Sequence, residues 1–273
     1  MAGGKGRCTV SDDRPMQTVA ITLAYDGAPF SGFARQEARC TVQGELESAL
    51  QILSRCPIET VGAGRTDAGV HAKGQVVSCA LPMHVSTDIE RLVLSLNALT
   101  PPALVVRAVQ TVPETFNARF DAVSRTYVYR IAQCDGAPPL FMAPYSWNLT
   151  TMLDIDAMRT AAAVLVGEHD FTSFCVAKSA SELQERDLST CRQILSADLD
   201  YEEELGERML RITVKGNAFL HSMVRVIVGT LVDVGRGNKE PTWVAEVLDA
   251  RDRTRAGQTA PAHGLMLDHI DYR

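Results

Sequence analysis

The sequence predicts an α+β fold with two related halves, whose strands form one continuous and mostly antiparallel sheet flanked by helices. Short segments rich in β-forming residues alternate with longer segments whose apolar residues recur at helical spacing. The same layout starts again after residue 120, without repetition of the residues themselves. We therefore expect two similar halves with a cleft between them.

The first half, residues 16–120, is expected to begin with a strand over 18–25, where β-forming residues precede a DGAP turn. A helix is predicted after Thr41, a good N-cap, because apolar residues then recur on one face. The other elements predicted here are a strand over 75–81, a helix over 89–99 closed by two prolines, and a strand over 104–112. Residues 1–15 are Gly-rich and polar, which predicts a flexible leader.

The second half, residues 121–273, repeats this rhythm. Its predicted elements are a strand over 125–132, a helix over 155–166 with Gly167 as its C-cap, strands over 192–199 and 209–215, and a helix over 218–234. The segment 177–187 (AKSASELQERD) is polar, and we expect it to form a surface loop.

The composition excludes several classes of protein. The chain of 273 residues is 46% hydrophobic and 22% charged, which is typical of globular proteins. It has no apolar run of about eighteen residues and no signal-peptide h-region, so we expect a cytoplasmic protein without a membrane partner. Seven cysteines without C-x-x-C spacing, and dispersed histidines, argue against a disulfide framework and a metal site. The net charge of −6 argues against a nucleic-acid partner unless basic residues gather locally.

The densest functional signal is GAGRTDAGVHA at 62–72, which combines Arg65, Thr66, Asp67 and His71 with three glycines. Glycines let the backbone bend tightly and hold an aspartate close to a ligand. The alternative is a glycine-rich turn in which Asp67 only caps the backbone. The segment lacks the Lys-Ser/Thr ending of a P-loop, which makes a phosphate cradle the weaker interpretation.

A second signal is the predicted strand SRTYVYR at 124–130. Arg125, Tyr127 and Tyr129 share one face of this strand because side chains alternate. Cations and aromatic rings on one face suit base stacking and phosphate contact. The alternative is that both tyrosines are half-buried residues of a sheet.

A third signal is Arg225 on the predicted helix 218–234, whose apolar residues cover most of its circumference. A guanidinium on such a helix needs an anionic partner or a water-filled cleft, because an unpaired buried charge costs roughly 3–5 kcal/mol. A structural salt bridge remains the alternative. His221, nearby, is interpreted as a core or supporting histidine rather than a metal ligand.

Taken in order, these segments resemble the TruA family of tRNA pseudouridine synthases. The resemblance spans nearly the whole chain after the leader, and GRTDAGVHA alone is highly specific. The matching segments are YDG (25–27), TVQGELE (41–47), AGRTDAGVHA (63–72), FNARF (116–120), RTYVYR (125–130), GEHDFTSF (167–174), GNAFLHSMVR (216–225) and TAPAHGL (259–265).

The resemblance implies two α/β halves of the RNP- or ferredoxin-like type, with the active site in the cleft between them. It also implies a homodimer that uses no metal and no small-molecule cofactor. The implied reaction is the isomerisation of uridine to pseudouridine at positions 38, 39 and 40, in the anticodon stem-loop of tRNA.

Carried over residue by residue, the family's catalytic nucleophile is Asp67, its active-site tyrosine is Tyr127 and its active-site arginine is Arg225. Arg65 matches the arginine that enters the base stack during flipping. The expected substrate-binding residues are Arg65, Tyr127, His71 and Phe219. Phosphate contacts are expected from a basic cluster comprising Arg35, Lys73, Arg119, Arg125, Arg130, Arg236 and Lys239.

The reaction breaks the N1–C1′ bond, turns the base and joins C5 to C1′, which a carboxylate can assist without a cofactor. Asp67 attacks C1′, removes the 2′ proton or adds at C6, and the sequence leaves these three routes open. Arg225, paired with Asp67, would keep the carboxylate charged and fix its direction. The nearest competing function is that of a paralogous pseudouridine synthase with a different site preference. The rivals from other classes are a non-catalytic RNA-binding module and a hydrolase that releases uracil.

Overall fold

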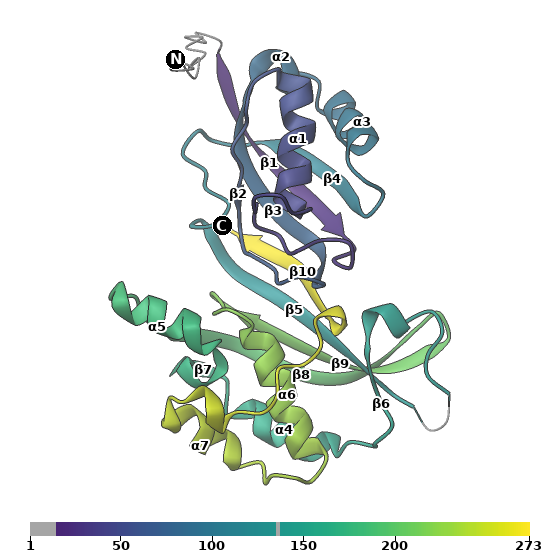
Figure 1. The fold of residues 1–273 in the computed structure, drawn as a ribbon, viewed down its shortest axis with the longest axis vertical. Coiled ribbons are helices and arrows are strands. Elements are labelled where there is room, and N and C mark those ends of the chain that lie inside the picture. Colours follow the sequence, from purple (N-terminus) through teal and green to yellow (C-terminus); the bar gives the residue numbers. More distant parts are fainter. Residues whose placement is uncertain (1–14, 135–136) are drawn as a thin grey trace, which may run out of the picture.

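A computed structural model describes residues 15–134 and 137–273 of the protein (Figure 1). All of the predicted leader except Pro15 lies outside these residues. Within them, ten strands form one sheet in the order β4-β1-β3-β10-β5-β9-β8-β7, with β2 paired to β3 and β6 to β5. The pairs β3–β10 and β5–β6 are parallel and the others antiparallel. The predicted α+β class, with a long and mostly antiparallel sheet flanked by helices, is confirmed.

One end of the sheet is built from residues 16–111. Its elements are β1 (Met16–Tyr25), α1 (Val42–Ser54), β2 (Val61–Gly62), β3 (His71–Pro82), α2 (Met83–Ser86), α3 (Ile89–Leu99) and β4 (Leu104–Thr111). Thr41 caps α1 as predicted, since its hydroxyl accepts a hydrogen bond from the amide of Gly44. Asp88 caps α3 in the same way, through the amide of Arg91.

The other end is built from residues 122–272. Its elements are β5 (Ala122–Gln133), β6 (Trp147–Leu149), α4 (Ile155–Ala163), β7 (Gly167–Asp170), α5 (Ala177–Glu185), β8 (Cys191–Glu204), β9 (Glu207–Gly216), α6 (Met223–Gly235), α7 (Trp243–Ala250) and β10 (Leu265–Tyr272). Helix α4 packs against α6, α7 and β8. Figure 1 shows α4, α6 and α7 gathered below this end of the sheet, while α1, α2 and α3 lie beside the other end.

The C-terminal strand β10 joins the two ends of the sheet. It runs antiparallel along most of β5 and meets β3 in a short parallel contact, where Met266 pairs with His71 and Leu267 with Ala72. The ends are thus bridged by a strand from the far end of the chain. A continuous apolar core follows the sheet across this seam, from Val19 in β1 to Val232 in α6.

Three predicted elements differ from the observed ones. Segment 177–187, expected to be a loop, forms α5, because its Ala, Glu, Leu and Gln residues are good helix formers. Gly167, expected as a helix C-cap, is the first residue of β7, and α4 ends earlier at Ala163. Helix α6 begins at Met223 rather than at 218, because Ser222 has a left-handed backbone with φ of 57°.

Two findings bear on the compositional predictions. No helix in the described part of the chain is long and apolar enough to cross a membrane. The six described cysteines are all free thiols, as their spacing predicted.

Candidate functional site

A cavity of about 840 Å³ lies beside the seam of the sheet. Its walls come from the loop after β1, the loop between β2 and β3, the start of β5, α5 and the segment before α6. The lining residues with chemical function are Arg65, Thr66, Asp67, Arg119, Arg125, Tyr127, Ser179, Arg192, His221 and Ser222. Segments that lie far apart in the sequence therefore meet around Asp67.

The carboxylate of Asp67 is held from one side. Its Oδ2 accepts a hydrogen bond of 2.7 Å from Nη1 of Arg225 and another of 2.7 Å from the hydroxyl of Ser222. Its Oδ1 accepts no hydrogen bond from the described residues, and Nε2 of His221 lies 3.5 Å from it. One oxygen is therefore anchored by two donors, while the other has no hydrogen-bond donor among the described residues.

The guanidinium of Arg225 is held by a backbone carbonyl in addition to its bond with Asp67. Its Nε donates to the carbonyl of Ala260 at 2.8 Å, and its side chain is 18% exposed. The segment carrying Ala260 lies very close to α6, because a Cβ on Gly229 would be only 1.8 Å from the carbonyl oxygen of Gln258. The pairing of Arg225 with Asp67 expected from the sequence is thus present, and the guanidinium fixes the direction of the carboxylate.

The loop that carries Asp67 is held mainly by its backbone. The carbonyl of Thr66 accepts from the amide of Phe33, and that of Asp67 accepts from the amide of Val70. The hydroxyl of Thr66 also lies 2.8 Å from that of Tyr25, so β1 fixes this side of the loop. The position of Asp67 is therefore set by neighbours along the whole turn.

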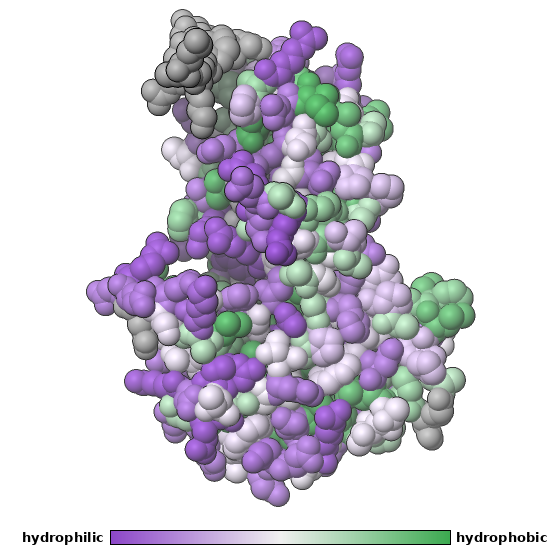
Figure 2. All heavy atoms as spheres, in the orientation of Figure 1, coloured by the Kyte–Doolittle hydropathy of each residue, from purple (hydrophilic) through white to green (hydrophobic). Residues whose placement is uncertain are grey.

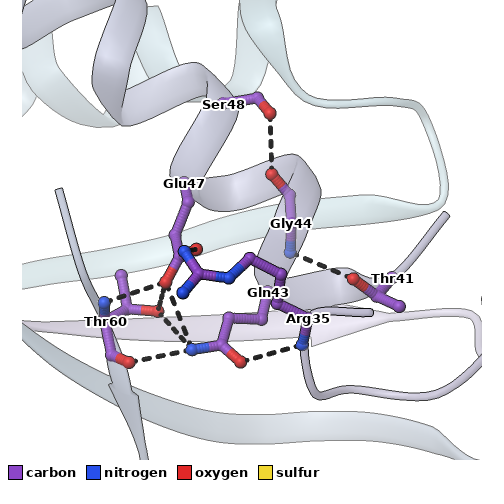
Figure 3. Close-up of polar contacts among 7 residues, drawn as sticks. All are labelled: Arg35, Thr41, Gln43, Gly44, Glu47, Ser48 and Thr60. Carbon is purple, nitrogen blue, oxygen red and sulfur yellow. Dashed lines mark hydrogen bonds and ion pairs between the residues drawn. The ribbon is translucent and has the colours of Figure 1, made fainter. Parts of the chain in front are cut away.

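A buried carboxylate fixes the chain just before this loop (Figure 3). Glu47 in α1 accepts hydrogen bonds from the amide and hydroxyl of Thr60, from Gln43 and from Arg35. Thr60 directly precedes β2, which leads into the Asp67 loop. Since Glu47 is only 7% exposed, these bonds act in a poorly solvated environment and tie α1 firmly to the loop.

Tyr127 lies in the cavity wall next to Phe219. Their rings pack edge to face with centroids 5.0 Å apart, and Phe219 also lines the cavity. Burial raises the pKa of the Tyr127 phenol well above its usual value. The phenol therefore keeps its proton at neutral pH, and the aromatic pair offers a surface on which a base can stack.

The predicted common face of strand 124–130 is buried. The guanidinium of Arg125 donates to four carbonyls, those of Ala63 (2.9 Å), Arg119 (2.7 Å), Ala122 (3.2 Å) and Asn217 (2.6 Å). Tyr129 is fully buried, and its hydroxyl donates to the carbonyl of Pro261. These donors bind protein carbonyls that hold the cavity walls together, and the phosphate contact expected of Arg125 stays a prediction.

His71 does not line this cavity. Its Nδ1 lies 3.0 Å from the amide nitrogen of Gly27 and 3.1 Å from Asp26, and its Nε2 lies 3.1 Å from the carbonyl of His263. Burial lowers the pKa of His71 and outweighs the opposite effect of Asp26. The neutral ring then accepts from Gly27 and donates to His263. Its predicted contact with substrate stays a prediction.

The cavity is basic although the chain is acidic. Among its described lining residues, Asp67 is the one carboxylate, against the arginines Arg65, Arg119, Arg125 and Arg192. Arg65 is exposed at this site, as its predicted role requires. The other cations expected in the basic cluster do not line this cavity, and each meets a protein group, so their contact with phosphate stays a prediction. They are Arg35 with Glu47, Lys73 with Asp268, Arg130 with Glu202, Arg236 with Trp147 and Lys239 with Trp243.

The sequence reasoning missed Ser222, Arg192 and Ser179. Ser222 was assigned to the interior of a helix, and only its position three residues before Arg225 could have suggested that both reach the same carboxylate. His221, interpreted as a core or supporting residue, is half-exposed beside Asp67, and its Nδ1 lies 2.7 Å from the hydroxyl of Ser179 in α5. Across the described chain, no group of three or more His, Cys, Asp or Glu residues could hold a metal ion.

Comparison with known proteins relates this geometry to a family. A family model described as tRNA pseudouridine synthase matches residues 21–121 and 161–273. The tRNA pseudouridine synthase A of Brevibacillus brevis is 43% identical over 259 residues, covering 94% of this chain and 100% of that protein. The corresponding protein of Bacillus subtilis is 42% identical over 253 residues, covering 92% of this chain and 97% of its own.

Among solved structures, an archaeal box H/ACA sRNP Nop10–Cbf5 complex aligns with 82% of this chain and 47% of that chain. The identity is 14% and the TM-score 0.36, a similarity too low to support an argument. The ranges matched by the family model include Asp67 and Arg225, whereas Tyr127 lies in the gap between them. The chain therefore belongs to the tRNA pseudouridine synthase family.

Proposed function

We propose that this protein isomerises uridine to pseudouridine at positions 38, 39 and 40 of the tRNA anticodon stem-loop, with Asp67 as the nucleophile. The observation that carries the proposal is a carboxylate held by Arg225 and Ser222 in a basic cavity beside an aromatic pair. Family membership supports the reaction class and the tRNA substrate.

The cavity suits a nucleotide turned out of its stack. Its volume of about 840 Å³ is in the range of sites that enclose small molecules. Extruding a stacked base costs a few kcal/mol, which side chains that enter the vacated space help to offset. Arg65, exposed two residues before Asp67, is the side chain proposed for this role. Arg119 and Arg192 are proposed to attract the phosphates on either side.

In the proposed reaction, Asp67 acts in its ionised form. Arg225 and Ser222 both stabilise that form, and the N-terminal end of α6 adds a favourable dipole. Attack at C1′, removal of the 2′ proton and addition at C6 all use the same carboxylate. Because its phenol is protonated, Tyr127 is proposed to stack on the base and to receive the C5 proton only if it passes its own proton on.

The test is pseudouridine mapping by carbodiimide labelling and primer extension on unmodified tRNA, with wild type and Asp67→Asn. We expect primer-extension stops at positions 38–40 with wild type and none with Asp67→Asn. The asparagine side chain has nearly the same shape and size as the aspartate side chain that it replaces. An anticodon arm that wild type binds but leaves unmodified contradicts the proposal.

The mass of the RNA separates this proposal from its rivals. Isomerisation leaves the mass unchanged, whereas a hydrolase releases uracil and leaves an abasic site. An RNA-binding module without activity leaves both the mass and the primer-extension pattern unchanged. Intact mass together with carbodiimide-dependent stops therefore identifies pseudouridine formation alone.

We also propose that the protein acts as a homodimer, as the family resemblance implies. Leu140, Phe141 and Leu205 are 75%, 59% and 68% exposed. They lie close together, because Glu207 accepts the amides of Leu140 and Phe141 next to the hairpin that carries Leu205. Figure 2 shows hydrophobic residues projecting at the right of the view, where Figure 1 draws the hairpin between β8 and β9. Sedimentation equilibrium should give a dimer for wild type and a monomer for Leu205→Glu; a wild-type monomer at micromolar concentration contradicts the proposal.

A further inference from the structure

Ser222 breaks the usual rules for the residue that precedes a helix. An N-cap normally has an extended backbone, and its side-chain oxygen accepts an amide of the first turn. Ser222 instead has φ of 57° and ψ of 13°, and its side chain makes no capping hydrogen bond. A left-handed backbone is strained for a residue with a Cβ. The capping role thus does not explain this serine.

The hydroxyl of Ser222 goes to Asp67 instead. It donates to Oδ2 at 2.7 Å, the same oxygen and the same distance as Nη1 of Arg225. The left-handed turn makes this possible, because it ends the preceding loop and starts α6 with the amide of Met223 on the carbonyl of Leu220. The unusual backbone and the absent cap thus have one explanation.

We infer that Ser222 is a positioning residue that gives the two oxygens of Asp67 different roles. Oδ2 is the anchored oxygen, bound by Ser222 and Arg225, and Oδ1 is the oxygen left to act on the substrate. This inference rests on the proposed function, since it assumes that Asp67 reacts.

The two donors are not redundant. Arg225 supplies charge and is itself tied to Ala260, which limits how far it can follow the carboxylate. A single bond to Oδ2 leaves the carboxylate able to rotate about it, whereas donors from two different positions restrict that rotation. Ser222 is therefore expected to affect the rate of the chemical step, and RNA affinity much less.

Three substitutions at this position separate positioning from backbone structure. Ser222→Ala keeps the strained backbone and removes the donor. Ser222→Gly removes the donor and also the strain, because glycine adopts positive φ freely. Ser222→Asn tolerates the left-handed region and offers an amide donor at about the same place.

The measurement is pseudouridine formation in single turnover with saturating enzyme, together with the enzyme concentration for half-maximal rate and the thermal midpoint. We expect the saturated rate to fall roughly 10- to 100-fold in Ser222→Ala and Ser222→Gly, as the loss of a hydrogen bond to a charged group implies. The enzyme concentration for half-maximal rate should stay within about threefold of the wild-type value, and Ser222→Asn should recover most of the saturated rate.

Arg55→Gly is the matched control. Arg55 also has a left-handed backbone, with φ of 56°, but it lies exposed at the opposite end of α1 from the cavity. Glycine there should maintain or raise the thermal midpoint and leave the saturated rate unchanged. Ser222→Gly should likewise maintain or raise the thermal midpoint, but its saturated rate should fall.

The outcomes are distinguishable from failure of the proposed function. If wild type forms pseudouridine, Asp67→Asn does not, and Ser222→Gly keeps the wild-type rate, the role of Ser222 is structural and the inference is overturned. If wild type forms no pseudouridine on tRNA that it binds, the proposed function itself is wrong, whatever the Ser222 variants show. Loss of rate in Ser222→Gly with an unchanged or higher thermal midpoint supports the inference.

Discussion

Asp67 and His71 lie four residues apart in the same segment, yet they lie in opposite environments. Asp67 is 21% exposed in the large basic cavity, held by donors from the segment before α6. His71 is 5% exposed and belongs to a separate cavity of about 260 Å³, where it bridges Gly27 and His263. One short segment thus supplies both the proposed reactive group and a structural link across the seam.

This difference predicts that substitutions on the Asp67 side change the rate, whereas those on the His71 side change stability. Arg225→Ala tests the first half of that statement. It leaves the partly buried carboxylate without its charged partner, and we expect the saturated rate of pseudouridine formation to fall roughly 10²- to 10³-fold. Arg225→Lys should lose less, since it retains the charge but not the bond to Ala260. A wild-type rate in Arg225→Ala in single-turnover assays contradicts this role.

Arg125 supports the Asp67 side through carbonyls alone. Arg125→Met leaves four carbonyls without their donors, and we expect the free energy of unfolding to fall by about 3 kcal/mol. Arg125→Lys should retain only part of this stability, because a single ammonium group does not match the planar, multiple-donor guanidinium of arginine. Urea unfolding measures the change. Arg125→Met with wild-type stability and weaker tRNA binding would mean that Arg125 contacts phosphate after all.

His71→Ala tests the other side of the comparison. The amide of Gly27 loses its buried acceptor, and we expect the free energy of unfolding to fall by about 1–3 kcal/mol. The saturated rate of the folded variant should stay within about threefold of wild type, since the ring is outside the cavity. If the half-saturating enzyme concentration rises while urea unfolding is unchanged, His71 contacts the substrate and the contrast with Asp67 disappears.

The smallest expected effect is a pH dependence of stability from His71. Its pKa is lowered by burial, so below the ordinary pKa of about 6.5 the unfolded chain binds a proton that the folded chain resists. Its contribution to stability is therefore fully present above pH 6.5 and decreases as the pH falls toward its folded-state pKa. Urea midpoints from pH 7.5 to 5.5 should fall more steeply for wild type than for His71→Gln. Equal slopes contradict the lowered pKa.

The predicted fold agrees with the observed one where local signals were strong. Thr41, the predicted N-cap, starts its helix because a polar side chain there satisfies a backbone amide of the first turn. Strand 209–215 lies within β9 because β-forming residues alternate through it. The start of α6 was placed too early, since nothing local reveals that Ser222 has a left-handed backbone.

The candidate site also has features that local sequence signals predicted and features that they did not. Asp67, Tyr127 and Arg225 were identified from short specific strings, and the structure brings all three together. Arg125 and Tyr129 were placed on a common face correctly, but this face is buried against protein groups, and its contact with RNA stays a prediction. Periodicity assigns a residue to a side of a strand, but it does not say what packs against that side.

The sequence by itself determined the fold class, the family and the principal candidate site residues, because those depend on periodicity and on strings of residues close together in the chain. The tertiary structure alone decided that β10 joins the two ends of the sheet, that His71 lies outside the Asp67 cavity, and that Ser222 and Arg225 hold the same oxygen. These features depend on contacts between residues as far apart in the chain as His71 and Met266, whose geometry exists only once the chain has folded.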